Sequence, residues 1–343
     1  MLIFLWIQLA IAATIIVIAA MFLTRASDVI AVKTGLGRSF VGVVLLATAT
    51  SLPELGTGIS SISIVGEPDL AAGDAFGSNL FNLLIVGLLE LLWWNRNFLG
   101  QVNSSAVIVG MLAIGVTVLA TLAVQLHSMP TPFDDWFLSP VSVGVIGFFI
   151  VAMYVIYRNE ASGDTVATED MQYADKRLSA SFLLYGLAAL LVVGAAIWLA
   201  TVGDFIADEM GWEASFMGTQ FLAAATSLPE LATSYAAIRI NAPELAISNL
   251  LGSNIFNMGF VLFLDDVAYT NGAFWAVISP IHVVTGVLAV LMTTIVVLHI
   301  RSGVGKVSLT FSKAISVLLV GMYATASFLV WRCLLYTSPS PRD

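Results

Sequence analysis

Charged residues are scarce in this chain: Asp, Glu, Lys and Arg together make up 10% of its 343 residues, whereas hydrophobic residues make up 59%. The mean hydropathy is +0.97. A water-soluble domain needs far more polar surface than this composition supplies. The scarcity of charge therefore excludes a soluble fold and predicts an integral membrane protein.

Cysteine and histidine are also nearly absent. Cys333 is the single cysteine, so a disulfide framework and a cysteine-based metal site are excluded. The three histidines, His127, His282 and His299, are scattered, and we expect them to be interfacial residues near helix ends. The sequence also lacks a His-Glu metal motif and a Gly-x-Ser-x-Gly nucleophile motif. We therefore expect neither an enzyme nor a bound cofactor.

Long apolar runs, by contrast, are abundant. A helix needs roughly 20 apolar residues to cross a bilayer, and ten stretches of about that length predict an all-α protein with ten transmembrane helices. They cover residues 2–24, 39–65, 70–94, 104–126, 137–157, 179–201, 215–238, 243–264, 272–299 and 308–331. From about Cys333 the apolar pattern ends, and we interpret residues 333–343 as a non-native or disordered tail that does not continue the last helix.

The few basic residues lie on one side of this ten-helix arrangement, whereas acidic residues, including Asp265 and Asp266, occupy the loops on the other side. Because basic loops tend to stay in the cytoplasm, we expect a multi-pass plasma-membrane protein with both termini extracellular or periplasmic. The eleven informative residues are Arg25, Lys33, Arg38, Arg96, Arg158, Lys176, Arg177, Arg239, Arg301, Lys306 and Lys313.

Seven residues, Ala-Thr-Ser-Leu-Pro-Glu-Leu, occur twice, at 49–55 and at 225–231, and a Gly-Ser-Asn motif follows each copy. Five helices per half is an odd number, so the second half must be inverted relative to the first, as in many secondary transporters. We expect helices two, three, seven and eight to be broken. The expected divisions are a first five-helix repeat, 1–157, a cytoplasmic linker, 158–178, and a second inverted repeat, 179–332.

The repeat places a carboxylate, Glu54 or Glu230, inside the membrane twice. Such residues are rare and usually functional, because lipid cannot solvate their charge. Pro53 and Pro229 lack an amide hydrogen, so each helix should break beside its Thr-Ser pair and free carbonyl oxygens. Hard cations prefer carboxylate, carbonyl, hydroxyl and amide oxygens. The candidate ligands are Glu54, Glu230, Ser51, Ser227, Ser78, Ser253, Asn82, Asn257 and the carbonyls of Ala47, Thr50, Ala223 and Thr226.

Two polar stripes accompany the carboxylates. Asp74, Ser78 and Asn82 are four residues apart and share a helix face, and Asn249, Ser253 and Asn257 repeat this spacing. Each stripe alone could serve hydrogen bonding between helices, and the glutamates could be protonated structural groups. The coincidence of both stripes with the duplicated Pro-Glu pair favours a cation pathway.

These paired motifs closely resemble the α-repeats of the cation/calcium antiporter superfamily, specifically its sodium/calcium exchanger branch of prokaryotic type. The resemblance implies that calcium is bound by Glu54 and Glu230 with the carbonyls of Thr50 and Thr226. It implies that helices one and six slide to alternate access. For sodium it implies Ser51, Ser78, Ser227, Ser253 and the carbonyls of Ala47 and Ala223, with Asn82 and Asn257 completing the cluster.

The chain departs from the family pattern in three places. Ala49 and Ala225 precede Thr-Ser where glycine is usual. Many relatives carry an aspartate at the position of Asn82 or Asn257, whereas both are amides here. Asp74 occupies a position where asparagine is usual, and we expect it to add a carboxylate near the outer approach to the site.

The expected function is secondary active exchange of sodium for calcium by alternating access at a central carboxylate site. A calcium/proton antiporter of the same fold is the first alternative, and a passive channel or a receptor that uses the carboxylates as a sensor is the second. The expected partners are calcium, sodium and the lipid bilayer, with no nucleic acid and no obligate protein partner.

Overall fold

The described part of the chain is helical. The computed structural model describes residues 2–34, 47–93, 98–102, 105–160, 176–239, 243–302 and 308–337, and these residues contain no strand. Eight of the described helical segments are long and apolar enough to cross a membrane. They are Leu2–Ala26, Pro68–Leu92, Ala106–His127, Pro140–Asn159, Leu178–Met210, Pro243–Ala268, Ile281–Arg301 and Leu309–Arg332. The chain is thus an all-helical, multi-span membrane protein.

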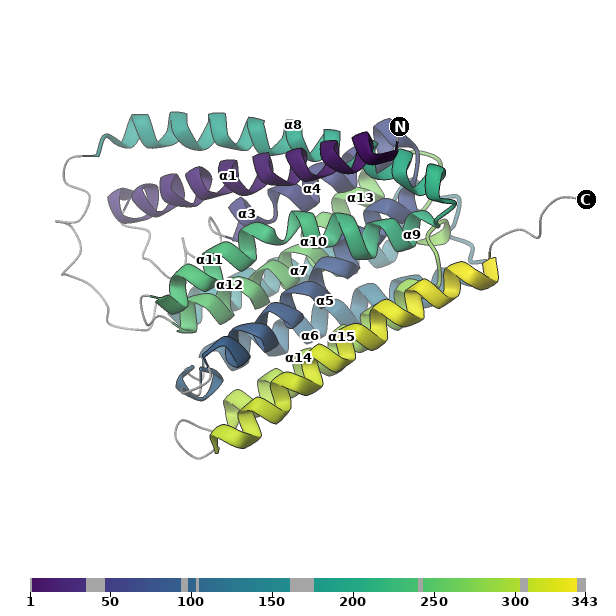
Figure 1. Ribbon diagram of the computed structural model, residues 1–343. Coiled ribbons are helices and arrows are strands. Elements are labelled where there is room, and N and C mark those ends of the chain that lie inside the picture. The colour runs from purple at the N-terminus through teal and green to yellow at the C-terminus, as the bar shows by residue number, and fades with distance from the viewer. Residues whose placement is uncertain are drawn as a thin grey trace, which may run out of the picture.

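The two longest helices, α1 (Leu2–Thr34) and α8 (Leu178–Met210), are the expected helices one and six. They pack side by side along one flank of the bundle and run in opposite directions (Figure 1). Both continue beyond the apolar stretches that predict them, so Asp204 and Asp208 lie in α8 and not in a loop as expected. Gly211, with a left-handed φ of 65°, ends α8, because glycine adopts this conformation without a steric penalty.

Two further segments are interrupted, as predicted for helices two and seven. The breaks fall at Ser51 (φ −92°, ψ 7°) and Ser227 (φ −85°, ψ 3°), two residues before Pro53 and Pro229. The two serines therefore adopt nearly the same backbone conformation, in a sparsely populated region where many active-site residues occur. The pieces are α3 (Ala47–Thr50), α4 (Leu52–Ser60) and the π-helix η2 (Ser61–Val65), then α9 (Ala214–Met217), the π-helix η4 (Gly218–Leu222), α10 (Ala223–Thr226) and α11 (Leu228–Arg239).

The prediction that helix three is broken is wrong. It is a single α-helix, α5 (Pro68–Leu92), because its one proline stands at the first position, where no helical hydrogen bond is lost. Helix eight is also unbroken, since α12 (Pro243–Phe256) continues through one π-helical turn, η5 (Asn257–Val261), into α13 (Leu262–Ala268). A π turn uses one more residue than an α turn, so it rotates the residues that follow it.

The remaining elements complete the bundle and correct one boundary. The last helix extends to Thr337, five residues into the segment 333–343 that was expected to lie outside the fold. Residues 338–343, 39–46 of expected helix two and 161–175 of the expected linker lie outside the described residues. The elements are η3 (Leu99–Gln101), α6 (Ser105–His127), α7 (Pro140–Glu160), η6 (Phe274–Ala276), α14 (Ile281–Arg301) and α15 (Leu309–Thr337).

The core of the bundle is built on α5 and on α12 to α13. Their spans are 72% and 78% buried, against 22% for α15, so most of their polar side chains face protein and not lipid. Gly77 permits a close approach of α5 to the interrupted segment: a Cβ at this position would lie 2.5 Å from the carbonyl oxygen of Thr219. The small residues therefore bring α5 directly against η4 and α10.

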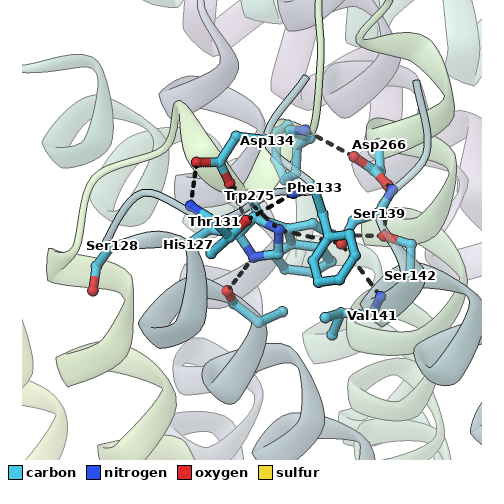
Figure 2. Close-up of polar contacts among 12 residues, drawn as sticks. His127, Ser128, Thr131, Phe133, Asp134, Ser139, Val141, Ser142, Asp266 and Trp275 are labelled. Carbon is cyan, nitrogen blue, oxygen red and sulfur yellow. Dashed lines mark hydrogen bonds and ion pairs between the residues drawn. The ribbon is translucent and has the colours of Figure 1, made fainter. Parts of the chain in front are cut away.

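A polar network closes the end of the bundle where α6 meets α7 (Figure 2). The carboxylate of Asp266 accepts hydrogen bonds from the amide of Ser139 (3.1 Å), the hydroxyl of Ser142 (2.6 Å) and the amide of Phe274 (2.8 Å). Trp275 donates to the same Ser142 hydroxyl at 2.6 Å. The expectation that Asp265 and Asp266 are loop residues is thus wrong, because both are fully buried in α13.

Candidate functional site

The repeated glutamates lie in the first turn of the helix that follows each break. Glu54 and Glu230 are 1% and 0% exposed. Oε1 of Glu54 accepts a hydrogen bond from Ser227 at 3.4 Å, and Oε1 of Glu230 accepts one from Ser253 at 3.2 Å. The second oxygen, Oε2, of each glutamate has no hydrogen-bond partner among the described residues.

One contact between hydroxyl groups joins each short helix before a break to a long helix of the other half: α3 to α12, and α10 to α5. The hydroxyls of Thr50 and Ser253 are 3.3 Å apart, and those of Ser78 and Thr226 are 3.4 Å apart. Each pair links a threonine beside a break to a serine of a Gly-Ser-Asn motif. The structure therefore brings these four predicted residues together around the two glutamates.

The amide side chains form a layer beside the glutamates. Asn82 donates to Oδ1 of Asn254 at 2.9 Å, and Asn254 donates to the carbonyl oxygen of Asn79 at 3.3 Å. Oδ1 of Asn82 and both amide atoms of Asn257 have no partner within the described chain. Asn79 and Asn254 were not among the predicted site residues. Each is the asparagine of a Gly-Ser-Asn motif, and this repeated position would have indicated them.

Asp74 is a third buried carboxylate of this cluster. It accepts hydrogen bonds from Thr57 and, at 2.8 Å, from the hydroxyl of Thr226. The counterpart amide of Asn249 instead donates to Thr233 at 3.0 Å. The two halves thus use the same positions for hydrogen bonding, but the first half has one more carboxylate.

The remaining predicted ligands lie at the breaks. The hydroxyl of Ser51 is fully buried and has no hydrogen-bond partner among the described residues. The carbonyl of Ala223 accepts the amide of Ser227 at 3.1 Å and the hydroxyl of Thr226 at 3.3 Å, so it is already bonded within its own helix. Ala47 begins α3 at the corresponding place, four residues before Ser51.

Several acceptor oxygens in this cluster therefore have no protein donor among the described residues. A buried acceptor without a partner costs about 1–3 kcal/mol, and a buried charge costs more. A cation removes that cost by accepting electron pairs from carboxylate, hydroxyl and amide oxygens. The donor set is the one that hard cations require. The unpaired oxygens are Oγ of Ser51, Oε2 of Glu54 and Glu230, and Oδ1 of Asn79, Asn82 and Asn257.

Comparison with known proteins identifies the family. The sequence profile of the sodium/calcium exchanger protein family matches residues 4–158 and 180–332. The chain belongs to this family. Its members are transporters, and exchange of cations across a membrane is therefore the activity that the exchanger shares with them.

The exchanger also matches individual relatives over most of its length. It is 27% identical to the inner membrane protein YrbG of Escherichia coli, over 94% of both chains. It is 26% identical to the sodium/calcium exchanger MaX1 of Methanosarcina acetivorans, over 74% of this chain and 82% of the relative. A solved structure of the sodium-calcium exchanger NCX_Mj superposes with a TM-score of 0.61 and 20% identity, over 95% of this chain and 98% of that one. This last likeness establishes the fold alone.

Acidic side chains gather near the connection between η2 and α5 of the exchanger. Burial raises the pKa of Glu67, and the neighbouring carboxylates of Asp204, Asp69 and Asp208 raise it further. Asp69 itself accepts hydrogen bonds from the amide of Ser279 (2.6 Å) and from His282 (3.2 Å). This end of the bundle is therefore negatively charged.

The histidines lie at or near helix ends, as expected. Each is buried and bonded: His127 contacts Ser139 at 3.2 Å, and His299 contacts Ser312 at 3.0 Å. His282 contacts Asp69 and stacks on a phenylalanine of α5. Within the described residues their side chains hydrogen-bond to Ala123, Ser139, Asp69 and Ser312, so their roles there are in helix packing.

Proposed function

We propose that this exchanger moves sodium and calcium in opposite directions across the plasma membrane, through one site centred on Glu54 and Glu230. The observation that supports this most strongly is the buried set of unpaired oxygens around the two glutamates. Calcium binds to about six to eight oxygens, and the predicted ligand set supplies that number. Two carboxylates facing one site would repel each other, and bound cations relieve that repulsion.

Sodium would bind at the same cluster through the serine hydroxyls and backbone carbonyls beside the breaks. These oxygens are neutral, so they suit a monovalent ion better than a second divalent one. Two of these hydroxyls, those of Ser227 and Ser253, contact Glu54 and Glu230, so the positions of sodium and calcium overlap. The two ions therefore compete, and this competition couples their movements. The similarity to MaX1, whose name states sodium/calcium exchange, supports this assignment.

The paired contacts support an arrangement of ten helices as two inverted repeats. The Thr50 to Ser253 contact is matched by that of Thr226 to Ser78, and the two breaks share one backbone conformation. In Figure 1, α5 and α12 run in opposite directions, as do α1 and α8. An inverted repeat gives the protein two related conformations that open the site to opposite sides.

We propose that α1 and α8 slide to produce alternating access. These two helices pack against each other and contact the broken segments: α8 contacts α4, and α1 contacts α11. Their flanks carry large apolar side chains exposed to lipid, which offers no directional bond to resist movement. The basic ends of α1 and α11 lie at the same end of the bundle, which supports a cytoplasmic side there and both termini outside (Figure 1).

The test is transport in proteoliposomes. Vesicles loaded with sodium should accumulate radioactive calcium from a sodium-free medium. Glu54→Gln and Glu230→Gln should each abolish uptake, because the amide cannot supply the charge. Glu209→Gln, the same chemical change at an exposed position near the end of α8, is the matched control and should retain uptake.

Three outcomes would overturn the proposal. Calcium uptake retained by both glutamate variants would show that Glu54 and Glu230 do not form the transport site. Uptake driven by a proton gradient in sodium-free buffer, and not by a sodium gradient, would establish calcium/proton exchange instead. Single-channel currents without any requirement for a gradient of a second ion would establish a channel.

A further inference from the structure

Asp265 is a buried carboxylate that the proposed site does not use. It lies in α13, is 0% exposed, and neither of its oxygens has a hydrogen-bond partner within the described residues. Its neighbour Asp266 makes three hydrogen bonds. An isolated buried carboxylate is expensive, so the two adjacent residues must be explained separately.

The first half of the chain shows which of the two carboxylates serves the fold. Glu90 near the end of α5 accepts the amide of Leu99, the first residue of η3, at 2.9 Å. Asp266 accepts the amide of Phe274, the first residue of η6, in the same way. Glu90 follows Asn82 by eight residues and Asp266 follows Asn257 by nine. The extra residue is accounted for by the π turn η5.

Asp266 is therefore the counterpart of Glu90, and Asp265 is the counterpart of Leu89. Leu89 is a fully buried apolar residue of the core. The fold of one half is thus satisfied by leucine at a position where the other half buries a carboxylate. Packing alone does not require that carboxylate.

The side chain of Asp265 points toward α4. A Cβ added at Gly58 would lie 2.5 Å from Oδ1 of Asp265 and 3.0 Å from Oδ2, so the glycine leaves room for both oxygens. Gly58 follows Glu54 by four residues and therefore lies on the same helix face, one turn further along. The adjacent residue Thr57 donates to Asp74. Asp265 and Asp74 thus lie against consecutive residues of α4.

A second unpaired group continues this face. The hydroxyl of Ser61, three residues after Gly58, is fully buried and lacks a hydrogen-bond partner in the described part of the chain. Helix α13 packs against both α4 and η2, which places the carboxylate of Asp265 and the region of Ser61 in one contact layer. The face runs from Glu54 toward Gly66, where η2 ends beside the acidic group around Glu67.

We propose that Asp265, with the hydroxyl of Ser61 and the charge of Asp74, forms a second cation site one helical turn from Glu54, on the side of the acidic end. Its ligand is a monovalent cation of the size of sodium. Both oxygens of Asp74 already accept hydroxyl hydrogen bonds, so one carboxylate remains, and too few oxygens are free for calcium. The inference rests on the proposed function, since it extends the same pathway.

The experiment measures binding to the full-length protein in detergent. Equilibrium binding of radioactive sodium should fall by one ion per chain in Asp265→Asn. The sodium concentration for half-maximal calcium exchange in proteoliposomes should rise about tenfold, which corresponds to about 1.4 kcal/mol. Asp135→Asn makes the same chemical change at an exposed position and should bind sodium like the unmodified protein.

A second variant keeps the proposal testable if Asp265→Asn fails to fold. Gly58→Ala leaves every charge in place but puts a methyl group in front of both carboxylate oxygens, and it should also lose one sodium ion. Unchanged sodium binding in whichever variant elutes as a folded monodisperse protein would overturn the inference. A fall in bound calcium with sodium unchanged would also overturn it, because the cation would not be monovalent.

Failure of this inference is distinguishable from failure of the proposed function. If Glu54→Gln and Glu230→Gln abolish exchange but Asp265→Asn retains all its sodium, only the second site is wrong. If both glutamate variants retain exchange, the central site is wrong, whatever the sodium stoichiometry of Asp265→Asn.

Discussion

The two halves of this exchanger repeat their hydrogen bonds closely but differ in charge. The donors and acceptors around the breaks correspond, and each half ends its central helix with a carboxylate bound to the amide of a 3-10 turn. The first half, however, has Asp74 where the second has Asn249, and its Glu90 is neutralised by Lys313 of α15, whose Nζ lies 3.0 Å from Oε1. In the second half, Asp265 has no hydrogen-bond partner among the described residues. Duplicated geometry thus fixes the fold, whereas unequal charge can make the two halves functionally different.

The ion pair of Glu90 and Lys313 gives the largest expected effect on stability. Lys313 also donates to the backbone carbonyls of Glu90 and Trp93, and Glu90 is fully buried. Lys313→Met would leave a buried charge without its partner, which costs about 3–5 kcal/mol. The thermal unfolding midpoint in detergent should therefore fall sharply.

The double variant Glu90→Gln with Lys313→Met separates charge from packing. It removes both charges, so most of the lost stability should return. Arg301→Met removes an exposed cation from the end of α14 and is the control. If the unfolding midpoint of Lys313→Met equals that of Arg301→Met, the ion pair of Glu90 and Lys313 does not stabilise the first half.

Asp266 tests the corresponding position of the second half, where its three donors among the described residues are two backbone amides and a serine hydroxyl. Asp266→Asn replaces an acceptor oxygen by an amide nitrogen, which must then face an N–H or O–H donor. Loss of a hydrogen bond to a charged group costs about 1.5–3 kcal/mol, so the midpoint should fall by less than in Lys313→Met. Asp135→Asn, the same change at an exposed position, is the control in this unfolding measurement. An unchanged midpoint would contradict the equivalence of Asp266 and Glu90.

Asp74 and Asn249 occupy corresponding positions of the two halves at the site, so each can be replaced by the residue of the other half. Asp74→Asn should fold, because Asn249 already makes the corresponding bond to Thr233. Removing one negative charge near Glu54 should weaken the apparent calcium affinity roughly tenfold, or about 1.4 kcal/mol. Asn249→Asp should have the opposite effect. Calcium-dependent uptake measures both, and unchanged half-saturation in both variants would show that the extra carboxylate is not felt by the ion.

The sequence predicted the spans and the two helix breaks well, because both depend on local composition and spacing. The apolar stretches located the eight long spans, and Pro53 and Pro229 located the two breaks. It did not predict that α5 is continuous or that α8 extends through Asp208. The proline rule applies to helix interiors, and Pro68 stands at a helix start, whereas a charged helix end beyond the membrane resembles a loop in composition.

Partnerships between distant residues were the least predictable feature. Asp265 and Asp266 are adjacent and identical in type, yet Asp266 has three hydrogen-bond donors and Asp265 has none in the part of the chain that the structure describes. The difference comes from the π turn before them and from the glycine at position 58. Neither can be inferred from the residues around the two aspartates.

The smallest expected effect concerns the end of α6, which we compare with the end of α14 because each carries a histidine. His127 has a carboxylate nearby, since its Nε2 lies 3.9 Å from Asp134, whereas His299 contacts Ser312. Hydrogen bonds from the hydroxyl and amide of Thr131 lower the pKa of Asp134 (Figure 2). A carboxyl whose pKa is lowered by folding stabilises the protein above its unfolded pKa of about 3.9, and the stabilisation is lost as the pH falls through the lower folded value. The thermal unfolding midpoint of the unmodified protein should therefore drop slightly more between about pH 5 and pH 3 than that of Asp134→Asn. If the midpoints of the two proteins instead fall in parallel with pH, the Asp134 carboxylate does not stabilise this end of the first half.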